Sequence, residues 1–209
     1  MPLPPDPKGV FLNVPYDNDF STLYIAYIVG LCQLGLVPHI ALEIPGGERR
    51  LDKIVQLIQS CRYSIHDLSR IELSVASSST PRFNMPLELG MTITWQILNP
   101  DQHTWFACES ERYRLQKSAS DLNGTDPLIH DGTVEGVLRE LRSAFQRDCT
   151  PSAPPVPQML KVYRLVNSAL NSVFTKNGTR DLYNRSVFLD LCSLTLSLGY
   201  FYPPAKPAF

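Results

Sequence analysis

The sequence lacks the features of membrane, secreted and zinc-binding proteins. No apolar run among its 209 residues approaches the length needed to cross a bilayer. The first seven residues have no apolar core of the kind that signal peptides carry. The five cysteines are scattered, without a CxxC pair or zinc-ligand spacing, which predicts free thiols in a reducing compartment. We therefore expect a cytoplasmic protein that binds no metal ion and no membrane.

Dense runs of one charge are also missing. The chain has 19 Lys and Arg against 20 Asp and Glu, and its formal net charge is −1. Duplex nucleic acid is usually bound by a basic patch, so we expect no binding to it. The phosphate-binding patterns G-x-G-x-x-G and G-x-x-x-x-G-K-[ST] are absent, which leaves kinase and dehydrogenase interpretations without support.

Strand and helix patterns alternate along residues 8–147. Short apolar runs of the kind found in buried parallel strands are separated by segments with helical periodicity. We expect strands at 10–14, 39–43, 61–68, 104–108 and 128–130, and helices at 21–36, 51–59, 84–98, 111–122 and 133–145. The alternation predicts a doubly wound, flavodoxin-like α/β fold, with a five-stranded parallel sheet in the order 2-1-3-4-5 and helices on both faces.

A proline-rich segment, residues 148–158, is expected to link this domain to a helical tail, residues 159–209. Two amphipathic helices are expected in the tail, at 159–173 and 186–198. The tail has more apolar surface than two helices can bury between them, through Leu182, Leu189, Leu191, Leu194, Leu196 and Leu198. We expect it to pack on the chain's own domain; the alternatives are a homodimer or a partner docked through the C-terminal helices.

Polar residues follow two strands that are expected to be neighbours. The first strand runs into Asn13, Tyr16 and Asp17, and the third runs into Asp67 and Ser69. Open α/β sheets bind ligands at the carboxyl ends of their strands, where the strand order reverses. These side chains either line a ligand site at that point or only form turns and caps.

The segment 81–91 carries the strongest candidate for a catalytic residue. Asn84 is expected to cap a helix, and Glu88 lies one turn further on, where the helix dipole favours the ionised carboxylate. Gly90 inside the helix indicates close approach by backbone or ligand. Glu88 is either a catalytic carboxylate or a residue that only complements the dipole.

One histidine is placed for acid–base chemistry. His66 stands beside Asp67, although a hydrogen-bonded core position is the more usual role of such a residue. None of the four histidines has the H-x-x-x-H spacing of a zinc site or lies two residues from a cysteine.

The pattern R-x-N-x-x-x-E-L-G at residues 82–90 resembles the Glu-Leu-Gly helix of nucleoside 2-deoxyribosyltransferases. It resembles equally a helix of prokaryotic TIR-like nucleotide-binding proteins found in antiviral defence. Residues 11–17 and 61–69 look similar to the first and third strands of an uncharacterised bacterial branch of that group. The likeness covers residues 8–147. The deoxyribosyltransferase pattern has Gly-Thr before the helix where this chain has Asn-Met-Pro, which weakens an interpretation as simple deoxynucleoside exchange.

The resemblance implies cleavage or transfer at the N-glycosidic bond of a nucleotide or nucleoside, in antiviral defence or signalling. Glu88 would attack the anomeric carbon or stabilise the oxocarbenium-like transition state. Substrate contacts would come from Asn13, Tyr16, Asp17, Asp67, Ser69, Arg82 and Asn84. The resemblance allows NAD as one of the substrates, and no cofactor is implied. The alternatives are a catalytically silent nucleotide-sensing module and a docking subunit of a larger complex.

Overall fold

The computed structural model describes residues 4–43, 49–71, 83–146 and 153–201. Its contacts divide the chain into two compact units. The first unit comprises residues 1–15 and 38–129, and the second comprises residues 16–37 and 130–209.

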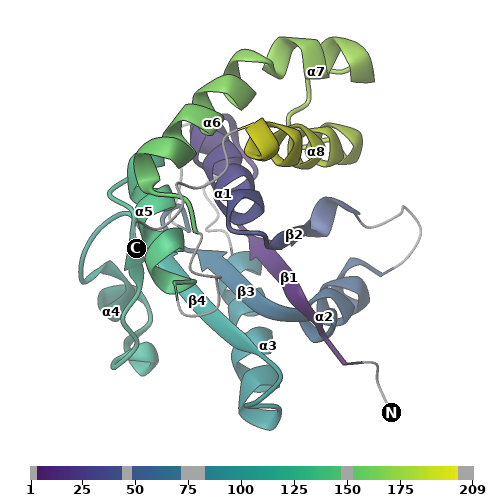
Figure 1. Cartoon of the computed structure of the whole chain (residues 1–209). Coiled ribbons are helices and arrows are strands. Elements are labelled where there is room, and N and C mark those ends of the chain that lie inside the picture. The colour runs from purple at the N-terminus through teal and green to yellow at the C-terminus, as the bar shows by residue number, and fades with distance from the viewer. Residues whose placement is uncertain (1–3, 44–48, 72–82, 147–152, 202–209) are drawn as a thin grey trace, which may run out of the picture. The chain divides into compact units, whose positions relative to one another are not determined.

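A parallel sheet forms the centre of the first unit (Figure 1). Its strands are β1 (Asp6–Asn13), β2 (Val37–Ile40), β3 (Cys61–Asp67), β4 (Thr104–Glu109) and β5 (Leu128–Ile129). They lie in the order β2-β1-β3-β4-β5, and the pairs β1–β3, β3–β4 and β4–β5 are parallel. The expected doubly wound α/β fold and its strand order are confirmed, and the order reverses between β1 and β3.

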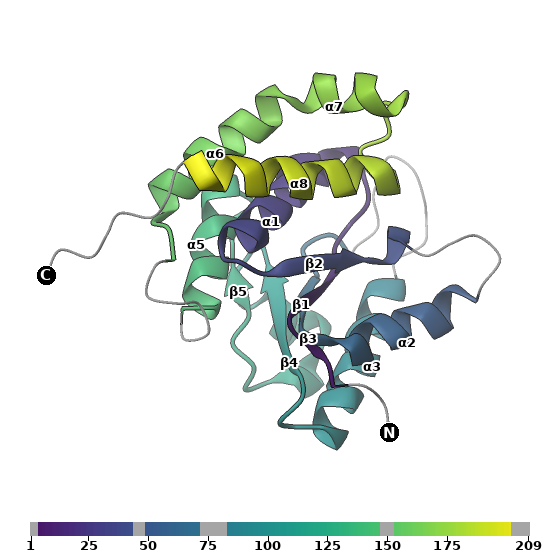
Figure 2. The same ribbon diagram turned by 45° about the vertical axis from the view of Figure 1, so that its right-hand side comes forward.

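Two long helices of the first unit pack beside each other (Figure 2). They are α2 (Arg50–Ser60) and α3 (Asn84–Leu98), and the shorter helices are α4 (Arg114–Ser118), η2 (Ala41–Glu43) and η3 (Ser120–Leu122). On α2, Ile54 and Ile58 pack with Phe11 of β1, and Trp95 of α3 covers this cluster. On α3, Met85 and Leu89 pack with Ala107 of β4. These apolar contacts hold both helices on the sheet.

Helices make up the second unit. They are η1 (Asn18–Phe20), α1 (Ser21–Gln33), α5 (Val134–Ala144), α6 (Val156–Ser168), α7 (Leu170–Asn177) and α8 (Arg185–Phe201). All residues of α1 from Leu23 to Cys32 are buried, and α1 packs against α5, α6 and α8. The leucine-rich tail therefore packs on a helix of its own chain, as expected.

Several expected boundaries are wrong. The helix expected at 159–173 is two helices, α6 and α7, and α6 begins inside the expected linker. The expected strand 39–43 becomes β2 and the 3-10 helix η2. The helix expected at 111–122 is divided into α4 and η3, and α4 begins only after Tyr113, which has a left-handed φ of 64°. The two units also group α1 and α5 with the C-terminal helices, whereas the sequence placed these helices in the domain 8–147.

No helix of the described segments combines the length and the apolar composition that a membrane span requires.

Candidate functional site

Asn13 connects the carboxyl ends of β1 and β3 with the first turn of α3. It pairs in register with His66 on β3, and both side chains are buried. The Asn13 Nδ2 atom donates to the carbonyl oxygen of Met85, at 3.2 Å, and lies 3.0 Å from His66 Nδ1. Three elements of the first unit are thus joined at the point where the strand order reverses.

His66 continues this contact into a chain of buried hydrogen bonds. Its Nε2 atom lies 3.2 Å from the hydroxyl of Ser64, and that hydroxyl lies 3.0 Å from Nε2 of His103. The Nδ1 atom of His103 lies 2.9 Å from the carbonyl oxygen of Cys61. We call Asn13, Ser64, His66 and His103 the polar relay.

The donor in each hydrogen bond of the polar relay can be assigned from the groups at its two ends, the amide of Asn13 and the carbonyl group of Cys61. The amide of Asn13 donates to Nδ1 of His66, so the imidazole is neutral and carries its proton on Nε2. Ser64 accepts that proton and donates its own to His103, whose Nδ1–H then donates to the backbone. Burial, with a smaller contribution from His103, lowers the pKa of His66 to about 3. Burial also lowers the pKa of His103, so both rings are neutral at physiological pH.

The relay determines which atom Asn13 offers to a ligand. Both protons of its amide group are directed at protein acceptors, Met85 O and His66 Nδ1. The carbonyl oxygen Oδ1, which can only accept a hydrogen bond, is left for other contacts. The sequence predicted Asn13 as a binding residue, and the structure gives the direction of the bond that it can make.

Asp67 and Ser69 form a turn directly after β3. The Oδ1 atom of Asp67 accepts from the backbone N–H of Ser69, at 3.0 Å, and from its hydroxyl, at 2.6 Å. This is the turn geometry that Asp commonly stabilises. Since the Ser69 hydroxyl donates to Asp67, it too presents an acceptor to any ligand.

Glu88 lies on the buried face of α3, with Met85, Leu89 and Thr92. Its residue surface is only 5% exposed. Burial raises the pKa of its carboxyl to about 7, against the opposing effect of the charge on Arg50 of α2. The expectation of a dipole-stabilised carboxylate is therefore wrong. Glu88 is the fifth residue of α3, beyond the first turn in which the dipole acts, and desolvation outweighs the rest.

The other predictions for the segment 81–91 concern Asn84, Gly90 and Arg82. Asn84 is exposed and is the first helical residue, while Phe83 occupies the N-cap position without a side-chain hydrogen bond, so the predicted Asn84 cap is wrong. A Cβ added at Gly90 would meet no atom of the described chain within 4 Å, so the expected close approach by backbone is not found, and approach by a ligand stays a prediction. Arg82 lies outside the described residues.

Tyr16 and Asp17 belong to the second unit, where both have structural contacts. The carboxylate of Asp17 caps η1 by accepting from the backbone N–H of Phe20, at 3.1 Å. The hydroxyl of Tyr183 donates to the carbonyl oxygen of Asp17. The ring of Tyr16 packs edge to face on Tyr24 of α1 and on Tyr183, with centroids 6.2 and 5.5 Å apart. These contacts tie the start of α1 to the segment before α8.

Glu109, at the carboxyl end of β4, was missed by the sequence analysis. It follows Cys108, the register partner of Asp67, and is completely buried. Its Oε2 accepts from the backbone N–H of Ser110, at 3.2 Å, and lies 3.9 Å from Nε of Arg114. The sequence signal that could have identified Glu109 is its position at the end of the next strand. Ligands bind at the carboxyl ends of strands in open α/β sheets, and this rule applies to Glu109 as it does to Asp67.

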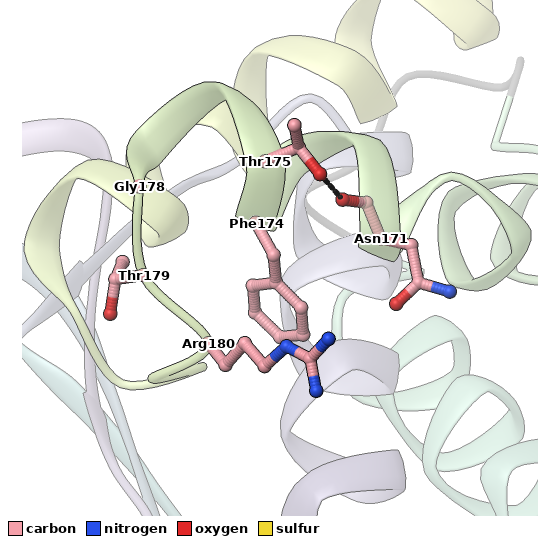
Figure 3. Close-up of a pocket in the computed structure, with 6 residues that line it drawn as sticks. All are labelled: Asn171, Phe174, Thr175, Gly178, Thr179 and Arg180. Carbon is pink, nitrogen blue, oxygen red and sulfur yellow. Dashed lines mark hydrogen bonds between the residues drawn. The ribbon is translucent and has the colours of Figure 1, made fainter.

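The second unit contains a pocket of about 350 Å³ (Figure 3). It is lined by Asn171, Phe174, Thr175, Gly178, Thr179 and Arg180. Figure 3 shows the guanidinium of Arg180 near the ring of Phe174, and Thr175 donates to the carbonyl oxygen of Asn171 at 2.9 Å. None of these residues is buried, so the pocket has no desolvated acid or base like Glu88.

In the described segments, no three His, Cys, Asp or Glu side chains are placed to hold a metal ion. A scan against protein-family models, a search of curated proteins and a search of solved structures each found no match to this chain.

Proposed function

We propose that the first unit cleaves or transfers the N-glycosidic bond of a nucleotide or nucleoside, with Glu88 as the catalytic carboxyl. One observation carries the proposal: a buried Glu88 with a pKa of about 7 lies on the helix whose first turn is bonded to the end of β1. Carboxyl groups with strongly raised pKa values are concentrated at catalytic sites. The resemblance of residues 82–90 to glycosidic-bond enzymes supports the same assignment.

Both forms of Glu88 are useful in this chemistry. Near pH 7 a carboxyl with this pKa is partly protonated and partly ionised. The protonated form can donate to the leaving base, and the ionised form can attack the anomeric carbon or stabilise an oxocarbenium-like transition state. A buried carboxylate interacts more strongly with a developing positive charge than a solvated one does.

The polar atoms at the carboxyl ends of β1 and β3 favour a sugar as the group that is bound. Asn13 offers its Oδ1, and Asp67 and Ser69 offer oxygen acceptors. Ribose hydroxyls are donors and match these acceptors, whereas a phosphate would not. Arg50, which interacts with Glu88, supplies a positive charge for a nucleotide phosphate. We propose NAD among the substrates and a cytoplasmic setting in defence or signalling, with no cofactor.

The test is to incubate the protein with NAD and a panel of nucleosides and nucleotides and to measure release of the free base by chromatography. We expect Glu88→Gln to reduce the rate by a factor of about 10²–10⁴, because the amide can neither donate a proton nor carry a charge. Glu111→Gln, at an exposed position, is the matched control and should leave the rate unchanged. Equal rates for Glu88→Gln and the wild type would exclude a catalytic role for this carboxyl.

Calorimetry separates an enzyme from a nucleotide sensor. If Glu88 acts in the transition state, Glu88→Gln should bind the substrate as tightly as the wild type does. If the site only senses a nucleotide, Glu88 would contact a ligand hydroxyl, and its loss should weaken binding by about 1–3 kcal/mol. Tight binding by the wild type without base release, and weaker binding by the variant, would favour the sensor.

A further inference from the structure

The outer face of α3 carries an apolar stripe. Positions 83, 87, 90, 94, 97 and 98 fall on one side of a helix with 3.6 residues per turn. Phe83, Leu87, Ile97 and Leu98 are all between 56% and 71% exposed. Thr94 donates its hydroxyl to the carbonyl oxygen of Gly90, at 2.9 Å, and so satisfies its polar atom within the helix. We call these six positions the α3 stripe.

The α3 stripe carries no charge. Glu88 is the one charged residue of α3, and it lies on the opposite, buried face. Surface helices of soluble domains normally carry charged or polar residues on the outer face. The four large side chains, each more than half exposed, present roughly 400 Å² of apolar surface on one helix face, the size at which a surface patch is often functional.

A pocket of about 110 Å³ adjoins the stripe, in the groove between α2 and α3. Its lining is almost entirely apolar and comes from both helices: Val55, Ile58, Gln59, Met91, Thr94, Trp95 and Leu98. On α2, the half-exposed Leu51 lies one turn before Val55 and extends the apolar surface across the groove. The same surface thus has both protruding side chains and a hole that can receive one.

The protrusions and the hole are spaced symmetrically along α3. Leu87 lies three and a half residues before the midpoint between Gly90 and Met91, and Thr94 lies the same distance after it. At 1.5 Å per residue, each is about 5 Å from that midpoint. If two copies of α3 cross antiparallel there, Leu87 of one copy reaches the pocket beside Thr94 of the other. Phe83 then meets Ile97 and Leu98 in the same way.

We propose that the α3 stripe is the contact surface of a homodimer whose two-fold axis passes between Gly90 and Met91. A two-fold interface uses the same patch on both copies and must be complementary to itself, which this knob-and-pocket spacing satisfies. The absence of charge gives a foreign partner nothing to pair with electrostatically. Gly90 has open space where a Cβ would stand, which allows two helix backbones to approach. The patch is smaller than the roughly 800 Å² per partner of a standard stable interface, so we expect a weak, concentration-dependent dimer.

The test is sedimentation of the full chain over a wide range of concentrations. We expect a wild-type dimer, and we expect Leu87→Glu to raise its dissociation constant at least about 30-fold, because each substitution removes two symmetric contacts. The matched control is Leu189→Glu, which changes a similarly exposed leucine on α8 and should leave the dimer intact. Circular dichroism would verify that both variants are folded.

A pair of complementary variants tests the geometry. Leu87→Glu and Thr94→Lys should each be monomeric alone and should associate when mixed, because these positions face each other across the axis. Gly90→Cys should form a disulfide-linked dimer under mild oxidation, and Gln56→Cys, at an exposed position on α2, should not. A wild type that stays monomeric at every concentration would overturn the proposal. So would a dimer that Leu189→Glu dissociates and Leu87→Glu does not, and that result would assign the contact to the tail.

Discussion

Replacing Glu88 by glutamine should make the stability of the first unit less dependent on pH. The pKa of the Glu88 carboxyl rises from 4.5 to about 7 on folding because the group is buried. The folded protein therefore holds this proton more tightly than the unfolded chain does. The stabilisation is complete below about pH 4.5. It is lost as the pH rises through about 7, because the carboxyl must then ionise in a desolvated environment.

The magnitude follows from the size of the shift. One pKa unit corresponds to 1.36 kcal/mol, so a rise of about 2.5 units corresponds to about 3 kcal/mol. Glutamine has nearly the same size and does not ionise. The free energy of unfolding of Glu88→Gln, relative to the wild type, should therefore increase by about 2–3 kcal/mol between about pH 5 and pH 8.

Tryptophan fluorescence gives an assay that is specific for the first unit. The chain has two tryptophans, Trp95 on α3 and Trp105 on β4, and both belong to that unit. Urea unfolding of the wild type, Glu88→Gln and the control Glu111→Gln would be followed at both pH values. If wild type and Glu88→Gln show the same pH dependence, the carboxyl is solvated in the folded protein. The catalytic assignment would then lose the observation that carries it.

Three further predictions concern the polar relay and the second unit. The ring protons of His66 should show no titration between about pH 5 and pH 8 in NMR spectra, because burial lowers its pKa to about 3; a midpoint near 6.5 would contradict the relay. Ser64→Ala should lower the free energy of urea unfolding, followed by tryptophan fluorescence, by about 1–3 kcal/mol, because it removes the hydrogen-bond partner of the Nε2 atoms of His66 and His103; an unchanged value would contradict the bonds. Gly136→Ala should lower the free energy of unfolding, measured by thermal unfolding, by about 3 kcal/mol, because its Cβ would lie 1.9 Å from the carbonyl oxygen of His130. An unchanged free energy would show that the backbone at His130 can move to make room.

The strand order could be predicted because few topologies are compatible with the pattern. Apolar runs that alternate with helices imply parallel strands with right-handed crossovers, and the five-strand order followed. Element ends were less predictable, since they depend on single residues. Helix α4 begins only after Tyr113, which has a left-handed φ, and no sequence signal distinguishes that tyrosine from a helical one.

The polar residues at the ends of β1 and β3 could be found in the sequence, but their contacts could not. The rule that ligands bind where the strand order reverses drew attention to Asn13 and Asp67, and the structure brings Asn13 into contact with α3. The polar relay could not be found, because the contact of Ser64 with His103 depends on the register of β3 against β4. The raised pKa of Glu88 was equally hidden, since it results from burial in the folded structure.

Helix α3 departs from the pattern of a surface helix on both of its faces. Its charged residue faces inward, where ionisation is unfavourable, and its outer face has exposed leucines and a phenylalanine where charges would be expected. Each departure lowers the stability or the solubility of an isolated unit. Departures from local rules are expected at functional sites, and two in one helix favour two functions. Glu88 and the α3 stripe point to opposite sides, so Leu87→Glu should abolish the dimer and leave the pKa of Glu88 near 7. A pKa that changed together with the oligomeric state would mean that the second copy, and not the fold of one chain, desolvates the carboxyl.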